Sequence, residues 1–488
     1  MKKYIYSILM AGLAIIASGC SDSFLDKSPS DAITTGEAIT SLQDVIVANN
    51  GLYSLMASTY YYNSAMFLYG DMRGDDMQPT YWSSSRSFHS FYMYQHSTQN
   101  PNNGGLWGRP YYIVRNAWNI IRAIENGDIK DATADQLDNY KGQALAIIAL
   151  CHFDLTRLYG YPFAKDNGES WGVPIVDHAI GFDENPERST VAQCYDFIID
   201  KLKEAIPLLS SAKDNGHINA YAARALLARV YLYCEKNDLA FATASQLIEA
   251  LKNNGDHYLV NREAYQAMFN LDNKFGPEAL FQIANTSSSN NGRDCMAYML
   301  NWWGYAAGVV TDDFGMFIRQ RDNDIRNSMV AYEEDGGSGV FYYILTKYPG
   351  SGGYWTTSYE NNYTVIRMSE LYLIAAEAGL KNGGSDRAKA LAYLNEIAMR
   401  ANPANEVSDA DFTLDKVLEE RRLELIGEGH RFFDMLRNGK TIVRKGGKHL
   451  SGAPEEINWD YFKCVLPISQ TQFTFNPEMP QNPGYAPR

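Results

Sequence analysis

Three separate stretches of the chain repeat apolar residues at intervals of three and four, and this spacing predicts amphipathic helices that pack in antiparallel pairs. The first stretch, residues 143–159, stops at the helix breakers Gly160 and Pro162. The second, residues 223–251, contains two such helices joined by a short polar turn. The third, residues 369–401, has the same arrangement with two glycines at its turn. Helix pairs therefore form the expected framework of the fold.

The spacing of these helical units along the chain is irregular, because they begin near residues 143, 220 and 367. Small and aromatic residues in the second unit occupy offsets close to the packing positions of a tetratricopeptide unit, namely Ala228, Tyr231, Ala240 and Ala244. The sequence thus predicts a mainly α-helical fold of tetratricopeptide-like helix pairs, interrupted by long insertions. Insertions in a helical stack form loops on one face, where ligands often bind.

Aromatic residues are concentrated in two of these insertions. Residues 53–112 contain 15 aromatics in 60 positions and residues 298–363 contain 15 in 66, whereas the chain as a whole is 13% aromatic. Both insertions are also rich in Gly, Asn, Ser and Asp, and neither shows the pattern of a long amphipathic helix. We expect these two segments to carry a loop-rich binding face.

The overall composition excludes several classes of protein. A chain of 488 residues that is 45% hydrophobic can bury a large core without disulfides or metals. The net charge of −14 argues against a nucleic-acid-binding protein, which gains affinity from clustered Lys and Arg. Beyond Cys20 there are five cysteines without a CxxC motif, so no disulfide framework is expected. Cys151 and Cys234 fall on apolar helix faces, where we expect them to be buried.

The N-terminus has the pattern of a bacterial lipoprotein signal. Residues 1–19 contain two lysines, a short apolar run and small residues, and Cys20 follows them. This pattern predicts removal of the signal peptide and acylation of Cys20, with residues 20–40 as a lipid-bearing tether. An ordinary signal peptide with an incidental cysteine is the alternative. The apolar run is too short to span a bilayer, so we expect the protein to be anchored to a membrane and not threaded through it.

Motifs that would indicate an enzyme are weak in this chain. It has no HExxH, GxSxG or GxGxxG motif. The Gly-Lys-Thr at residues 439–441 lacks the first glycine of a phosphate-binding loop and is better interpreted as a helix end. The pair Asp322 and Asp324 has calcium-loop spacing, but residue 327 is Asn where that loop requires glycine. We therefore expect no catalytic residue, no metal site and no cofactor, although carboxylate pairs leave a glycoside hydrolase as an alternative.

The residue types in the aromatic insertions suit carbohydrate binding. The polarised C–H face of a sugar ring packs on an aromatic ring, while carboxylate, amide and guanidinium groups bind the hydroxyls. The candidate ring platforms are Trp82, Trp302, Trp303, Tyr305 and Trp355. The candidate hydroxyl contacts are Asp76, Arg86 and Asn301. Any one of these rings could instead attach its loop to the helical body, and for Trp107, Trp118 and Trp459 core packing is the favoured interpretation.

The C-terminal stretch LEERRLELIGEGHRFFDMLRNGK, residues 418–440, closely resembles the signature of the RagB/SusD family of surface lipoproteins. Read physically, it is a charged helix broken at two glycines and followed by a shorter helix in which Arg431 and Asp434 can pair. We interpret it as scaffold. Further segments similar to the family are CSDSFLDKSPSDAIT, GQALAIIALCHFDLTRLYGYPFA, RMSELYLIAAEA and FNPEMPQNPGY, so the resemblance extends over nearly the whole chain.

The resemblance implies four tetratricopeptide-like helix pairs with an inserted binding face, divided into residues 41–270 and 271–488. It also implies an outer-membrane, cell-surface lipoprotein that captures oligosaccharide or polysaccharide and delivers it to a TonB-dependent transporter of the SusC type. Some members bind peptides, so a peptide- or protein-binding subunit of a nutrient importer is the main alternative. A purely structural subunit of the transporter is another. The signature does not identify the ligand.

Overall fold

The computed structural model describes residues 39–83, 87–101, 105–181, 183–270, 275–286, 288–350, 360–444 and 449–486. The signal peptide, Cys20 and most of the tether therefore lie outside the described residues, as do two candidate site residues, Arg86 and Trp355. Within the described part of the chain, no helix is long and apolar enough to cross a membrane.

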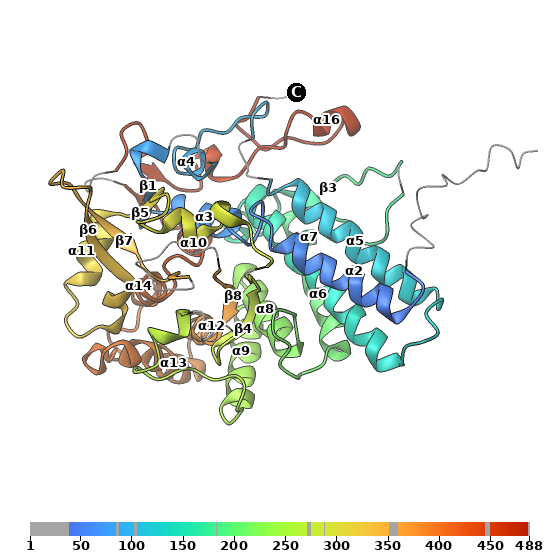
Figure 1. The fold of residues 1–488 in the computed structure, drawn as a ribbon, viewed down its shortest axis with the longest axis horizontal. Helices are drawn as coiled ribbons and strands as arrows, with labels where there is room; N and C mark the ends of the chain where they lie inside the picture. Colours follow the sequence, from blue (N-terminus) through green and yellow to red (C-terminus); the bar gives the residue numbers. More distant parts are fainter. Residues whose placement is uncertain are drawn as a thin grey trace, which may run out of the picture.

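The framework is a stack of helices in which each helix packs against the next in chain order (Figure 1). In sequence these helices are α2 (Leu42–Met56), α5 (Gly108–Glu125), α6 (Ala134–Tyr159), α7 (Val191–Ala205), α8 (Ala220–Tyr233), α9 (Asn237–Leu251), α12 (Met368–Asn382) and α13 (Asp386–Ala401). All three predicted helical stretches lie within this stack, so the predicted mainly α-helical architecture is confirmed. The small residues Ala228, Ala240 and Ala244 are fully buried, as close helix packing requires.

Both aromatic insertions fold into short elements on this stack. The first connects α2 to α5 and contains α3 (Ala65–Met72), β1 (Met77–Pro79) and α4 (Ser87–Tyr92). The second, residues 298–363, lies within the connection from α9 to α12, which contains, in order, β4 (Ala279–Ile283), α10 (Met296–Leu300), β5 (Gly308–Val310), α11 (Asp312–Arg319), β6 (Val330–Glu334), β7 (Phe341–Leu345) and β8 (Tyr363–Arg367). Strands of three to five residues show no periodicity that a sequence window could detect, so these insertions read as loops.

A four-stranded antiparallel sheet joins the two insertions, in the order β1-β5-β7-β6. It lies at the end of the molecule far from α2 and α5, with α11 beside β6 and β7 (Figure 1). The remaining strands form two-stranded ribbons: β4 with β8, β2 (Trp171–Pro174) with β3 (Arg188–Thr190), and β9 (Ile442–Val443) with β10 (Glu456–Ile457).

The signature segment forms α14 (Leu414–Glu424) and α15 (Arg431–Arg437), and it contacts the first insertion directly. Gly429 lies so close to Gly70 of α3 that a Cβ on Gly70 would sit 2.0 Å from the Gly429 carbonyl oxygen. The predicted pairing of Arg431 with Asp434 is wrong. Arg431 instead pairs with Asp75 at 2.6 Å, because the turn at the two glycines aims it at the inserted segment. The interpretation of the signature as scaffold agrees with this geometry.

The described cysteines behave as small core residues. Cys151 and Cys234 are buried, as predicted, and so are Cys194, Cys295 and Cys464. All five carry free thiols. Burial raises the pKa of the Cys151 thiol above its usual range, which keeps the thiol protonated and unreactive. These cysteines therefore contribute to packing and not to chemistry.

Candidate binding site

Two tryptophans more than two hundred residues apart meet because β1 pairs with β5. Met77 lies opposite Val310 and Pro79 lies opposite Gly308 in this antiparallel ladder. Trp82 follows β1 in a short 3₁₀ turn (Tyr81–Ser83), and Trp302 precedes β5 in the turn after α10. The pairing of β1 with β5 therefore places both tryptophans at the same edge of the sheet.

Four rings at this edge form one connected set, in which each ring contacts at least one other, and we call them the aromatic cluster: Tyr81, Trp82, Trp302 and Tyr342. The Trp82 ring centroid lies 4.8 Å from that of Tyr81, 5.9 Å from that of Tyr342 and 6.4 Å from that of Trp302. Trp302 lies 5.7 Å from Tyr342. Tyr81 is 67% exposed and Trp82 is 38% exposed. Rings that are held by neighbours yet open to solvent can serve as stacking surfaces for a ligand.

The turn that carries Trp302 is fixed by backbone and side-chain hydrogen bonds. The Asn301 side chain accepts a hydrogen bond from the Trp303 backbone N–H at 2.8 Å, and the indole N–H of Trp82 donates to the Tyr305 carbonyl oxygen at 3.2 Å. The Thr80 hydroxyl donates to the Ala306 carbonyl oxygen at 2.9 Å. The rings of the cluster are therefore positioned before any ligand arrives, which lowers the entropic cost of binding.

Gly304 is the point in this turn with the least space. A Cβ at Gly304 would lie 2.3 Å from the Tyr298 carbonyl oxygen, a backbone atom that cannot move without moving α10. We expect Gly304→Ala to shift the turn, to lower the free energy of unfolding by about 1–3 kcal/mol and to change the near-ultraviolet circular dichroism of the tryptophans. Gly255→Ala, where a Cβ meets nothing within 4 Å, is the matched control and should change neither. An unchanged tryptophan signal in Gly304→Ala would show that the turn adapts.

Tyr342 and Tyr81 belong to the cluster although neither is among the ligand contacts predicted from the sequence. Tyr342 is paired with Glu333 across β7 and β6, so both side chains stand on the cluster face of the sheet. The next residue, Tyr343, points to the opposite face, where its ring lies against Gly315 of α11. Residues 341–345 read FYYIL, an unbroken aromatic and aliphatic run, so the sequence does not reveal which of these side chains stand on the cluster face.

The charge around the cluster is acidic. Partial burial raises the pKa of Tyr342 above its usual value, and the nearby carboxylate of Asp335 and the phenol of Tyr81 add to this effect. Tyr342 is therefore a neutral hydroxyl at physiological pH, able to donate and accept a hydrogen bond. With Glu333 beside it, the cluster offers flat rings bordered by hydrogen-bonding groups.

The structure buries the side chains of two of the predicted hydroxyl contacts. Asp76 is 1% exposed, and its Oδ1 accepts a hydrogen bond from Arg422 Nε at 2.6 Å. Asn301 is 5% exposed and is engaged in the turn. Both residues position the cluster: the Asp76 carbonyl oxygen accepts from the Thr311 N–H, which ties the start of β1 to the end of β5.

Asp75 shows how the signature segment anchors this arrangement. Burial alone would raise the pKa of Asp75, but two hydrogen bonds from Arg431, at 2.6 and 2.9 Å, hold that pKa at about 2. The carboxylate is thus fully ionised and paired at physiological pH. Arg422 and Arg431 together clamp the residues that lead into β1, so the signature supports the candidate site without contacting it.

The other predicted rings lie near the cluster or outside the described residues. Trp303 is 56% exposed and Tyr305 is partly buried, and both occupy the turn that carries Trp302. Arg86 and Trp355 are not described. The expected core role of Trp107, Trp118 and Trp459 is confirmed, because Trp118 is buried and the other two pack against the core.

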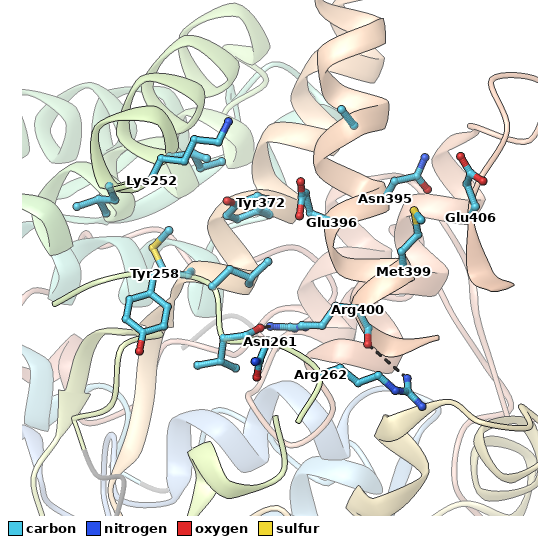
Figure 2. A pocket seen from close by; sticks show the side chains of 16 residues that line it. Lys252, Tyr258, Asn261, Arg262, Tyr372, Asn395, Glu396, Met399, Arg400 and Glu406 are labelled. Carbon is cyan, nitrogen blue, oxygen red and sulfur yellow. Dashed lines mark hydrogen bonds between the residues drawn. The ribbon is translucent and has the colours of Figure 1, made fainter. Parts of the chain in front are cut away.

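A cavity of about 830 Å³ lies elsewhere, between α9 and α13 (Figure 2). Lys252, Tyr258 and Glu396 line its open side, but much of the remaining lining is aliphatic. The guanidinium of Arg400 at its base is committed to Glu278 and Glu424. This cavity has volume for a ligand but offers one exposed ring, so it suits a sugar less well than the aromatic cluster does. Among the described residues, no group of three His, Cys, Asp or Glu side chains could hold a metal ion.

Comparisons with known proteins agree with this architecture. Residues 253–485 match the model of the SusD family, and residues 23–232 match a second family model, described as starch-binding associating with outer membrane. A crystal structure of a SusD superfamily protein from Bacteroides vulgatus is 50% identical, with a TM-score of 0.89 over 92% of this chain and 100% of that one. A SusD superfamily protein from Bacteroides thetaiotaomicron is 34% identical, with a TM-score of 0.85 over 91% and 100% of the two chains.

A more distant structure is surface glycan-binding protein A from Bacteroides thetaiotaomicron in complex with laminarihexaose. It is 21% identical and has a TM-score of 0.72 over 91% of this chain and 100% of that one, a likeness that shows the fold alone. The helix stack, the signature segment and the match along the full length of the 50% identical structure lead to one conclusion. This chain belongs to the SusD family.

Proposed function

We propose that this protein is a surface glycan-binding lipoprotein of the outer membrane, which captures oligosaccharide or polysaccharide without catalysis. The observation that carries the proposal is the aromatic cluster, in which rings from three distant segments are held in contact and open to solvent. Family membership and the description of the matching starch-binding family model support it. The bound hexasaccharide in a protein of the same fold adds to this support.

Capture would depend on stacking and hydrogen bonding alone. The C–H faces of successive sugar residues would pack on Trp82, Trp302 and the exposed Trp303, while Tyr342 and Glu333 would bind hydroxyls at the ring edges. Ring stacking tolerates small changes in sugar identity. Selectivity among glycans would therefore come from how well the curvature of the saccharide chain matches the arrangement of the aromatic rings. No bond of the sugar is broken in this scheme, and the ligand leaves unchanged.

Delivery follows from the proposed anchor. A lipid on Cys20 would hold the body at the membrane surface, and a chain of several sugars needs a protein channel to pass that membrane. We therefore propose a TonB-dependent transporter of the SusC type as the partner that receives the glycan. This step rests on the lipoprotein signal in the sequence and on the family.

The proposal is tested by titrating residues 21–488 with a panel of plant, fungal and host-type oligosaccharides in a calorimeter. We expect saturable binding to one class of glycan, with every oligosaccharide recovered intact after overnight incubation. Release of new reducing ends would contradict the non-catalytic role. If the protein bound none of the glycans but did bind peptides from a protein digest, the proposal that its ligand is a glycan would be contradicted.

A further inference from the structure

A second set of aromatic residues lines a groove at the opposite end of the molecule from the four-stranded sheet. The groove has a volume of about 400 Å³ and lies between the start of α5, the segment after β2, and α16 (Gln472–Phe475) with the residues that follow it. In Figure 1, α5 and α16 are well separated from β6 and β7, so this groove is not an extension of the aromatic cluster. Six residues that line it are Trp107, Tyr112, Arg115, Gln472, Phe475 and Asn476.

Two of these rings are exposed to an extent that core packing does not explain. Phe475 is 71% exposed and Tyr112 is 45% exposed. The Arg115 guanidinium lies over the Tyr112 ring, 5.0 Å from its centroid. A phenylalanine left in water forfeits about 25 cal/mol for every Å² of apolar area that it could have buried, so the groove gains when a ligand with an apolar face covers it.

The polar groups of the groove differ in their partners. Glu184 and Asn185 are hydrogen-bonded within their own segment, whereas three other polar side chains are not engaged by the described residues. None of the described residues forms a hydrogen bond with the side chains of Arg115, Gln472 or Asn476. A guanidinium and two amides present several donors and two acceptors beside flat rings. An entirely apolar partner would leave these groups unpaired, whereas a ligand with a C–H face and a rim of hydroxyls satisfies both kinds of surface.

Two of the walls of the groove, α5 and the segment after β2, are held by hydrogen bonds and ring packing. The Tyr111 hydroxyl donates to the Pro174 carbonyl oxygen at 2.8 Å, and the Trp118 indole N–H donates to the Val176 carbonyl oxygen at 2.9 Å. Trp107 packs edge-on against Tyr159 with ring centroids 4.7 Å apart. These contacts tie α5 to the segment after β2, so the groove exists without a ligand, as small-molecule sites usually do.

We propose that this groove is a second saccharide-binding site, in which Tyr112 and Phe475 are the stacking surfaces and Arg115, Gln472 and Asn476 bind hydroxyls. The proposal rests on the glycan ligand proposed above but on different residues. Two sites on one rigid body let a long polysaccharide bind at both, which raises its affinity through effective concentration beyond that of a short oligosaccharide.

The test compares three proteins by calorimetry: the wild type, a groove variant with Tyr112→Ala and Phe475→Ala, and a cluster variant with Trp82→Ala and Trp302→Ala. The probes are oligosaccharides of the plant, fungal and host-type panel and the polysaccharides from which they derive. We expect the cluster variant to lose about 30-fold in oligosaccharide affinity but to keep a weaker, saturable binding at the groove. We expect the groove variant to lose at least tenfold in polysaccharide affinity, and the variant with all four changes to bind neither probe. Tyr258→Ala, which removes an exposed ring beside the other cavity, is the control and should match the wild type.

The outcomes separate this proposal from the proposed function. If the cluster variant bound no saccharide and the groove variant bound saccharides as the wild type does, the second site would be overturned and the glycan-binding function would stand. Loss of all binding in the groove variant alone would support the groove and overturn the cluster as the capture site. No binding of any probe by the wild type would overturn both.

Discussion

Replacing Trp82 and Trp302 together with alanine is expected to weaken oligosaccharide binding by about 30-fold or more. Central aromatic residues of binding sites typically cost about 2 kcal/mol or more on truncation, and about 1.4 kcal/mol corresponds to a tenfold change in affinity. Both rings also hold Tyr342 in place, at centroid distances of 5.9 and 5.7 Å, so their loss removes two stacking surfaces and loosens a third. Calorimetric titration with the glycan identified from the panel measures the effect.

The matched control for this prediction is Trp171→Ala. Trp171 is 43% exposed, close to the 38% of Trp82, but it lies on β2 outside the cluster. We expect its affinity to equal that of the wild type. Unfolding curves of all three proteins separate lost contacts from lost folding, and a double variant that is folded and binds normally would show that the cluster is not the capture site.

Replacing Arg367 with methionine is expected to lower the free energy of unfolding by about 3–5 kcal/mol, the usual cost of stranding buried charges. Arg367 is 2% exposed, and its guanidinium donates to the carboxylates of Glu278, Glu424 and Glu428 at 2.8–3.1 Å. Glu278 directly precedes β4, and Glu424 and Glu428 belong to the signature segment, so one side chain joins the helix stack to both segments. Urea unfolding followed by far-ultraviolet circular dichroism gives the value.

Lys252→Met is the control for an ion pair at the surface. Lys252 pairs with Glu249 at 3.4 Å, and both side chains are largely exposed. Lys252→Met should lower the free energy of unfolding by less than about 1 kcal/mol. Glu428 also pairs with the buried ammonium of Lys347 at 2.7 Å, so adding Glu428→Gln to Arg367→Met takes this partner from Lys347 and is not expected to restore stability. A loss of less than about 1 kcal/mol in Arg367→Met alone would mean that the buried ion pairs contribute little net stability.

The helix pairs were predictable because the information for them is local. Residues three and four positions apart share a helix face, so α6, α8, α9, α12 and α13 are visible in the spacing of apolar residues alone. The aromatic richness of the two insertions is likewise a property of composition. The resemblance in residues 418–440 identified the family from a short segment, whose charges and glycines form contacts with the first insertion and with α12.

Which aromatic rings meet was decided by tertiary structure. Trp82 and Trp302 are brought together by the β1–β5 ladder, and Tyr342 by the pairing of β5 with β7. Pairing between short strands across such sequence separations leaves no periodic trace. The burial of Asp76 also depends on tertiary structure. The sequence shows only that Asp76 is acidic and lies among aromatic residues. The fold brings Arg422 from the distant signature segment into an ion pair with the buried Asp76.

The groove beside α16 illustrates the same division. The sequence showed Tyr112 within an aromatic insertion and FNPEMPQNPGY as a segment similar to the family, yet nothing in either segment indicated that Tyr112 and Phe475 would line one cavity. Local spacing fixes which elements form, because hydrogen bonds and side-chain contacts within a helix span only a few residues. The assembly of side chains from distant segments depends on how those elements pack, and that packing creates the aromatic cluster and the groove of this SusD-family protein.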